Sequence, residues 1–327
     1  MVNTIDSNLP ESPRAHGGPL CRGRLRYTPD DFQVTEQLGW EPCGDGEHDY
    51  LWLRKTGVNT AWLATQLALF AGVAPHDVGY AGLKDRHAVT EQWFSVPRWH
   101  QPDWSSFTLA GVEVLSVARH QRKLRKGAHQ SNRFCIRLRT VEGLSDSVLS
   151  ERLDVIRHQG VPNYFGEQRF GRHGANIDLA NTWARGRRLS RDKRSMAIST
   201  IRAFCFNTAL AERVHSETWH QLMVGDLANL DGSGSVFDVS AVDDELIRRC
   251  QSLDIHPAIA LVGEGSEGVP THWQAAFTRA RVEPGSRSLR MRAHDLKAEI
   301  DDDTVQLSFG LQRGCYATSL LREICEW

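Results

Sequence analysis

The chain has 327 residues, of which 40% are hydrophobic and 24% charged, and its formal net charge is −1. This length favours two domains, and the hydrophobic fraction supports packed cores. No apolar run approaches the roughly eighteen residues of a membrane-spanning helix. Residues 1–20 are polar and lack the apolar core of a signal peptide. The sequence therefore predicts a cytoplasmic protein.

The cysteines and histidines argue against a disulfide framework and a metal centre. The seven cysteines are scattered, no two have C-x-x-C spacing, and their number is odd. The 14 histidines form no metal-binding pattern, because the nearest cluster, His215 with His220, lacks a third ligand in sequence. The glycines of segment 263–268 alternate with acidic residues, which is not typical of a phosphate-binding loop. We expect neither a metal nor another cofactor.

The first half of the chain is predicted to form strands around one helix. Alternating apolar and polar residues indicate two short strands within 22–36 and a strand at 50–53. Asn59 or Thr60 can cap a helix that ends at Gly72, because both side chains accept hydrogen bonds from a first helical turn. Further strands are expected at 78–83, 92–96, 109–117 and 133–139.

The second half is predicted to be more helical. A helix that ends at Gly160 carries Leu149, Leu153 and Ile156 on one face. Other helices are expected at 197–214, 243–252 and 318–326, and the alternation within 305–309 indicates a strand. Helices mixed with short, hairpin-connected strands are typical of an α+β protein.

The segment 79–94 is the most informative part of the chain. It places Asp85 between Lys84 and Arg86, in a polar loop between two predicted strands. Neighbouring positive charge keeps a carboxylate ionised, which suits a nucleophile or a base that acts on a polyanion. From the spacing alone, a hairpin turn whose charges face water is the favoured interpretation.

Five segments in one order resemble the motifs of the TruD family of tRNA pseudouridine synthases. The segment around Asp85 reads GLKDRHAVTEQ over residues 82–92 and resembles the family signature that carries the nucleophilic aspartate. The other four are PDDFQVTE at 29–36, SNRF at 131–134, PNYFGEQRFG at 162–171 and GCYATSLLRE at 314–323. The resemblance covers residues 22–327.

This resemblance implies a domain organisation that composition does not reveal. Residues 1–21 would form a loose leader. Residues 22–159 and 291–327 would form a discontinuous catalytic domain with a mainly antiparallel sheet. Residues 160–290 would form an α+β insertion domain that is specific to the family, and the strand around Val305 and the motif at 314–323 would rejoin the catalytic sheet.

The resemblance also assigns the chemistry to Asp85, which matches the family's nucleophile. Asp85 would attack the ribose or abstract its 2′ proton, and the sequence leaves both routes open. Arg26 stands where many family members carry Lys, and its cation is expected to pair with Asp85. Lys84 and Arg322 are expected to support the catalytic group, Arg322 in an ion pair with Glu323.

Aromatic and polar side chains are expected to hold the target base. Phe134 matches the family's pocket aromatic and would stack on the uracil. Asn132 would face the same side of a strand and can both donate and accept hydrogen bonds. Phe32 is a second candidate for the pocket wall, with a core role as its alternative. Arg86 and Arg169 are expected to contact the RNA.

Two basic segments suggest where a polyanion binds. Residues 119–139 contain eight Arg or Lys and no Asp or Glu, and residues 185–202 contain seven against Asp192 alone. This uneven distribution fits an RNA-binding face, despite the neutral overall charge. The expected partner is tRNA, and the protein is expected to be a monomer.

The predicted function is isomerisation of uridine 13 in the D-arm of tRNA to pseudouridine. A non-catalytic RNA-binding or RNA-chaperone protein would use the same basic segments and is the alternative. A glycosidase-like hydrolase is a third reading, which needs a second carboxylate near the first. Glu91 is the candidate for that second group.

Overall fold

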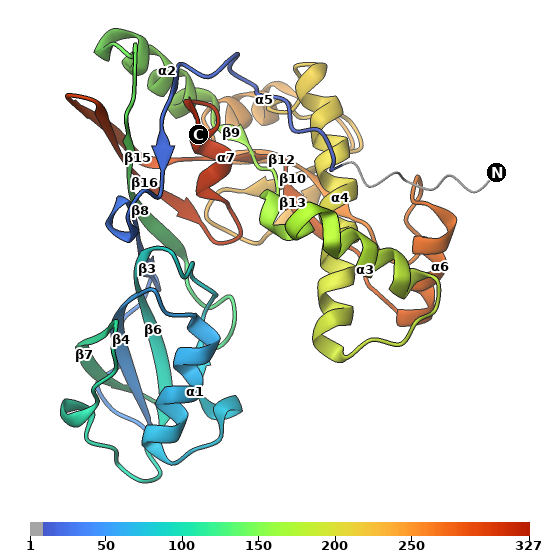
Figure 1. Cartoon of the computed structure of the whole chain (residues 1–327). Helices are drawn as coiled ribbons and strands as arrows, with labels where there is room; N and C mark the ends of the chain where they lie inside the picture. The colour runs from blue at the N-terminus through green and yellow to red at the C-terminus, as the bar shows by residue number, and fades with distance from the viewer. Residues whose placement is uncertain (1–8) are drawn as a thin grey trace. The chain divides into compact units, whose positions relative to one another are not determined.

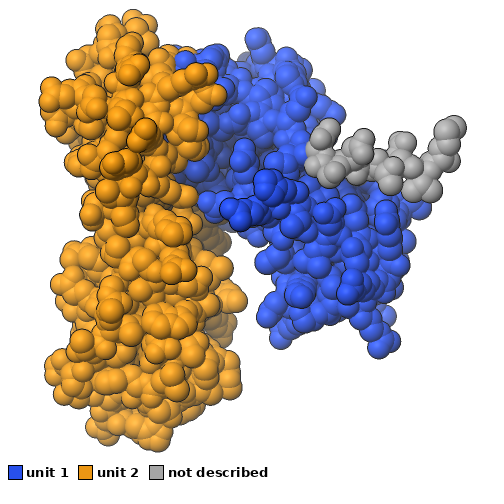
Figure 2. All heavy atoms as spheres, in the orientation of Figure 1, with its two compact units in different colours: residues 1–19, 154–292, 315–324 blue, residues 20–153, 293–314, 325–327 orange. Residues whose placement is uncertain are grey.

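The computed structural model describes residues 9–327 (Figure 1), which form two compact units. Unit 1 contains the described residues up to Pro19 together with Asp154–Arg292 and Cys315–Ile324. Unit 2 contains Leu20–Leu153, Ala293–Gly314 and Cys325–Trp327 (Figure 2). Within residues 9–327, no helix has the length and apolar character needed to cross a membrane.

A nine-stranded sheet forms the frame of unit 2. Along its path β3 pairs with β6 in parallel, and the other neighbouring strands are antiparallel. The path runs β15-β16-β8-β3-β6-β4-β7, and β2 and β5 pair with β8 and β6 beside it. The strands are β2 (Arg24–Leu25), β3 (Phe32–Gln37), β4 (His48–Thr56), β5 (Gly79–Tyr80), β6 (Val89–Pro97), β7 (Val112–His120), β8 (Ser131–Arg139), β15 (His294–Asp301) and β16 (Thr304–Gln312).

Helix α1 (Thr60–Ala71) packs on this sheet beside β6 in Figure 1. The Asn59 side chain accepts hydrogen bonds from the backbone of Ala61 and Trp62, and Gly72 ends the helix with a positive φ of 67°. Buried leucines of the helix, including Leu63 and Leu67, join strand residues in one hydrophobic cluster. The sequence therefore predicts this helix correctly, with Asn59 as its N-terminal cap and Gly72 at its end.

Unit 1 combines helices with a smaller sheet. The sheet has the order β11-β10-β12-β13, and a separate pair joins β14 to β9. The strands are β9 (Val161–Pro162), β10 (Leu227–Leu230), β11 (Val236–Asp238), β12 (Ile255–Leu261), β13 (Gly285–Ser288) and β14 (Arg290–Met291). The helices are α3 (Ala175–Ala184), α4 (Arg191–His215), α5 (Asp244–Gln251), α6 (Thr271–Ala280) and α7 (Ala317–Leu321). Trp183, Ile201 and Trp273 belong to a core shared by α3, α4 and α6.

The boundary between the units falls within helix α2 (Asp146–Gln159), close to the predicted boundary at residue 160. Its predicted apolar face is buried, with Leu149, Leu153 and Ile156 at most 4% exposed. Residues 315–324, however, group with unit 1 and not with the large sheet. One reason is that the Ser319 hydroxyl donates to the carbonyl of Tyr164 at 3.1 Å.

Two predictions for the chain ends need correction. The helix expected at 318–326 ends at Leu321, and β17 (Cys325–Glu326) instead pairs in parallel with β1 (Cys21–Arg22). In the predicted loose leader, residues 1–8 lie outside the described residues, but Ala15 and His16 are held by hydrogen bonds from their backbone nitrogens to Glu323. This buried carboxylate needs donors, so it fixes the segment that approaches it.

Candidate active site

The loop that carries Asp85 is fixed from behind by buried polar side chains of unit 2. Thr60 accepts a hydrogen bond from the Lys84 backbone nitrogen at 3.0 Å, and Gln92 donates to the Gly82 carbonyl at 3.2 Å. Lys55 is 1% exposed, and its ammonium group donates to the Asp85 carbonyl at 2.9 Å. Burial lowers the pKa of Lys55 to about 8. The backbone of the loop is therefore anchored on both sides of Leu83.

The Asp85 side chain pairs with Arg26, which is 59 residues away in the chain. Arg26 Nη2 donates to Asp85 Oδ2 at 2.5 Å, and the two side chains are 24% and 38% exposed. Arg26 has a positive φ of 58°, which is unfavourable for a residue with a side chain. Its guanidinium carbon also lies 4.2 Å from the centre of the Phe32 ring. These contacts hold the cation over a buried ring and against one oxygen of the carboxylate.

The sequence neighbours of Asp85 have other partners. Lys84 donates to Glu36 at 2.7 Å, and these side chains are only 6% and 0% exposed. Arg86 donates to the carbonyl of Gly57 at 2.9 Å. The two cations that flank Asp85 in sequence are thus used to fix the loop, and the contact with the carboxylate comes from the distant Arg26. Side chains of adjacent loop residues point in different directions, so Lys84, Asp85 and Arg86 have different partners although they are consecutive in sequence.

The predicted pocket residues lie on neighbouring strands of the large sheet. Phe134 is directly opposite Val34 of β3 and Phe309 of β16. Its ring stacks on Phe309, with centroids 5.3 Å apart, and meets the edge of Phe32 at 6.3 Å. Phe32 is 2% and Phe134 8% exposed. Contacts therefore connect Asp85 through Arg26 and Phe32 to Phe134.

Asn132 precedes Phe134 by two residues on β8, so both side chains point to the same face of the sheet. The side-chain oxygen Oδ1 of Asn132 is buried and has no hydrogen-bond partner among residues 9–327. A buried amide oxygen without a donor is costly unless a ligand supplies one. Asn132 Oδ1 is thus a buried acceptor on the face of β8 that also carries Phe134.

The two other predicted site residues, Arg169 and Arg322, belong to unit 1. Arg169 lies in a short 3₁₀ helix (Glu167–Phe170) and donates to the Tyr316 hydroxyl at 2.9 Å and the Ser199 hydroxyl at 3.3 Å. The Arg322 guanidinium donates to the carbonyl of Ser12 and lies 5.5 Å from the ring centre of Tyr164. Both cations thus have internal partners in unit 1.

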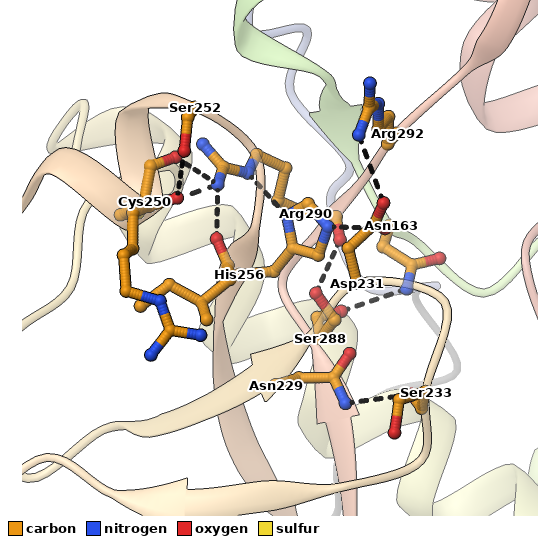
Figure 3. Close-up of polar contacts among 12 residues, drawn as sticks. Asn163, Asn229, Asp231, Ser233, Cys250, Ser252, His256, Ser288, Arg290 and Arg292 are labelled. Carbon is orange, nitrogen blue, oxygen red and sulfur yellow. Dashed lines mark hydrogen bonds and ion pairs between the residues drawn. The ribbon is translucent and has the colours of Figure 1, made fainter. Parts of the chain in front are cut away.

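Unit 1 also contains a buried polar cluster that the sequence analysis did not single out (Figure 3). Arg290 is 2% exposed and donates to the carbonyls of Cys250 and Ile255, each at 2.8 Å, and to His256 Nδ1 at 3.0 Å. His256 Nε2 lies 2.9 Å from Asp231 Oδ1. Because Nδ1 accepts from Arg290, the proton of the neutral imidazole sits on Nε2 and is donated to Asp231.

The expectations for a metal centre and for Glu91 as a second carboxylate can be compared with the geometry of the described residues. Residues 9–327 contain no group of three or more His, Cys, Asp or Glu side chains arranged to hold a metal ion. Glu91, the candidate second carboxylate, forms an ion pair with Arg54 at 2.9 Å. Arg54 also binds Glu113 at 2.8 Å, so Glu91 belongs to a charge network across the strands β4, β6 and β7. This arrangement disfavours the hydrolase reading.

Comparisons with known proteins agree with the motifs and the fold. Residues 15–180 and 270–324 match the sequence model of the tRNA pseudouridine synthase D (TruD) family. A protein named tRNA pseudouridine synthase D from Methylococcus capsulatus is 43% identical, over 96% of this chain and 94% of that protein. Its namesake from Proteus mirabilis is 41% identical, over 97% and 96% of the two chains.

The fold is also similar to that of a solved structure. The crystal structure of a Methanosarcina mazei protein assigned to tRNA pseudouridine synthase D superposes with a TM-score of 0.64. The two sequences are 18% identical, and the match covers 96% of this chain and 94% of the other. At this identity the likeness concerns the fold, and it confirms the predicted α+β class. Together with the near full-length relatives above 40% identity, these findings show that the chain belongs to the tRNA pseudouridine synthase D (TruD) family.

Proposed function

We propose that this protein converts a uridine of tRNA to pseudouridine, that the uridine is number 13 of the D-arm, and that Asp85 carries the reaction. Family membership supports the reaction class. Asp85 is assigned as the catalytic residue because its carboxylate is partly exposed and contacts Arg26 through one oxygen only. Its other oxygen, Oδ1, has no hydrogen-bond partner among residues 9–327 and is available to a substrate.

The reaction breaks the bond between N1 of uracil and C1′ of the ribose, turns the base, and joins C5 to C1′. The proton on C5 is lost to solvent and N1 gains one, so the step is an isomerisation without oxidation or reduction. Asp85 either attacks C1′ or removes the 2′ proton, and both routes require an ionised carboxylate. Arg26 holds the carboxylate through one oxygen and orients it.

The detached uracil must be held while it turns. We assign this task to Phe134, whose ring can stack on the base, and to Asn132, whose buried oxygen lacks a donor. Phe32 packs against both Arg26 and Phe134, and we assign it to the wall of the uracil pocket. Lys84 contributes by fixing the loop through Glu36.

The phosphate contacts are assigned to the two basic segments. Arg122, Arg125 and Lys126 are exposed in unit 2, and Arg187, Arg188 and Arg191 are exposed in unit 1. Arg86 and Arg169 are assigned supporting contacts to the RNA, and Arg322 a structural role in unit 1. The discontinuous unit 2 would be the catalytic domain and residues 160–290 the insertion domain. We further propose that the enzyme acts as a monomer in the cytoplasm without an added cofactor.

The test uses total tRNA from cells that lack the gene, labelled with tritium at C5 of uridine. Isomerisation releases tritium, whereas binding or base excision does not. Pseudouridines formed are then mapped by carbodiimide treatment and primer extension. A new signal at position 13, with tritium release, supports the proposal in full. Release with a signal at another position would overturn the assignment of uridine 13, and binding without release would favour an RNA chaperone.

A further inference from the structure

Two large hydrophobic side chains are exposed on residues close in sequence to Arg26 and Asp85. Leu83 precedes Asp85 by two residues and is 72% exposed, the highest value of any large hydrophobic residue among residues 9–327. Tyr27 follows Arg26 directly and is 62% exposed. Both residues belong to unit 2. Exposed nonpolar groups next to catalytic residues are candidates for contacts with the substrate.

Leu83 is exposed on a rigid segment. Its neighbours are fixed by the hydrogen bonds from Gln92 to the Gly82 carbonyl and from the Lys84 nitrogen to Thr60. These bonds hold the backbone on both sides of Leu83 in place, with the Leu83 side chain exposed. The side chain of the next residue, Lys84, is 6% exposed, so the loop presents Leu83 outward while it buries its neighbour.

Tyr27 is flanked by positive charge. The guanidinium carbons of Arg24 and Arg139 lie 5.9 Å and 6.0 Å from the centre of its ring. Arg139 is bound to Asp31, and Arg24 is exposed. An aromatic face with a neighbouring cation fits a nucleotide, because the ring can stack on the base and the cation can meet the phosphate.

The distance from the reaction centre is short. Consecutive Cα atoms are about 3.8 Å apart, so the Cα atoms of Leu83 and Asp85 are at most about 7.6 Å apart. This span corresponds to about two stacked nucleotides, at about 3.4 Å each. The Leu83 backbone therefore lies within about two nucleotide spacings of the Asp85 backbone, and Tyr27 is adjacent in sequence to the arginine that binds Asp85.

Chemistry at C1′ requires the uridine to leave its stack, which opens a gap between its neighbours. Nucleic-acid-binding proteins fill such gaps with apolar wedges such as leucine. We propose that Leu83 enters the gap left by the everted uridine and that Tyr27 stacks on an adjacent base, so that both hold the RNA open. This inference rests on the proposed function and adds two residues that contact the bases next to the target.

The experiment measures the single-turnover rate and the RNA dissociation constant of Leu83→Ala and Tyr27→Ala. Three substrates are compared: the intact tRNA and two tRNAs that are abasic at nucleotide 12 or 14. With intact tRNA, we expect each variant to be slower by about 10- to 100-fold, from the loss of one stacking contact. An abasic neighbour removes the stacking that opposes eversion, so on at least one abasic tRNA the variants should approach the wild-type rate.

Controls separate this inference from simpler explanations. Leu69→Ala removes a side chain of unit 2 that is 69% exposed on α1 and should leave the rate unchanged. Leu83→Met and Tyr27→Phe should retain most of the activity, and all variants should melt at the wild-type temperature. Wild-type rates in both alanine variants, or equal losses on all three tRNAs, would overturn the inference. A wild-type protein that modifies none of the tRNAs would instead overturn the proposed function.

Discussion

The two units each contain an arginine–carboxylate cluster, and the two clusters differ in how completely their hydrogen bonds are used. In unit 2, Arg26 meets one oxygen of Asp85, and both side chains are partly exposed. In unit 1, the buried Arg290 donates to three carbonyls, those of His220, Cys250 and Ile255, and to His256, which in turn binds Asp231. A saturated, buried cluster can stabilise the fold but has no free group to offer a substrate. The Arg26–Asp85 pair keeps exposed surface that a substrate can meet, which supports the role proposed for Asp85.

The largest effect should follow from Asp85→Asn. The amide has nearly the same shape but can act neither as a nucleophile nor as a base, so activity should fall by about 10⁴-fold or more. Folding and tRNA affinity should be nearly unchanged, because the side chain is partly exposed. Tritium release and a filter-binding assay measure the two quantities. Glu91→Gln is the matched control and should retain activity, and near wild-type turnover by Asp85→Asn would remove Asp85 from the mechanism.

A substitution in the buried cluster around Arg290 should lower stability, whereas Asp85→Asn should lower activity and leave stability nearly unchanged. Arg290→Met leaves three carbonyls and His256 without their donor, and we expect a loss of about 3–5 kcal/mol in the free energy of unfolding. Urea unfolding followed by tryptophan fluorescence measures it. Arg292→Met removes a side chain that is 40% exposed and should cost less than about 1 kcal/mol. If both variants lost the same free energy of unfolding, the greater burial of Arg290 would not explain its contribution to stability.

The basic segment of unit 2 can be tested by its salt dependence. Replacing Arg122, Arg125 and Lys126 together by Gln should weaken tRNA binding and flatten the plot of log affinity against log salt by up to about 0.9 per lost phosphate contact. Lys123 is left in place because its ammonium group binds the carbonyl of His76. A variant with the wild-type slope would place the RNA on another surface, such as the one around Arg187 and Arg188.

The smallest effect concerns pH. Burial lowers the pKa of His256 below its ordinary value of 6.5, so the unfolded chain binds a proton more readily than the folded one. The contribution of His256 to the free energy of unfolding is therefore fully present above pH 6.5. It decreases as the pH falls below 6.5, by at most about 1.4 kcal/mol per pH unit. Urea unfolding at pH 7.5 and at pH 5.5 should show a smaller difference for His256→Gln than for the wild type. The same difference in both proteins would contradict this contribution.

Local signals in the sequence were enough to predict much of unit 2. Asn59 and Gly72 specify the two ends of α1 through a side-chain cap and a positive φ, which depend on adjacent residues alone. The alternation of Val305, Leu307 and Phe309 predicts β16, because a strand buries every second residue. The family motifs singled out Asp85, Arg26, Asn132 and Phe134, and the roles of these residues remain predictions.

Other features depend on contacts between distant segments, and the tertiary structure alone decided them. Lys84 and Arg86, which flank Asp85 in sequence, bind Glu36 and the carbonyl of Gly57, and no local pattern indicates these partners. The pairing of Arg26 with Asp85, in contrast, was expected from the family resemblance and is confirmed. The cluster around Arg290 brings together Asp231, His256 and Arg290, which are far apart in the chain and belong to no sequence motif. The sequence determined helix ends and strand alternation because these follow from neighbouring residues. Which charges are paired, buried or left open depends on the packing of the whole unit.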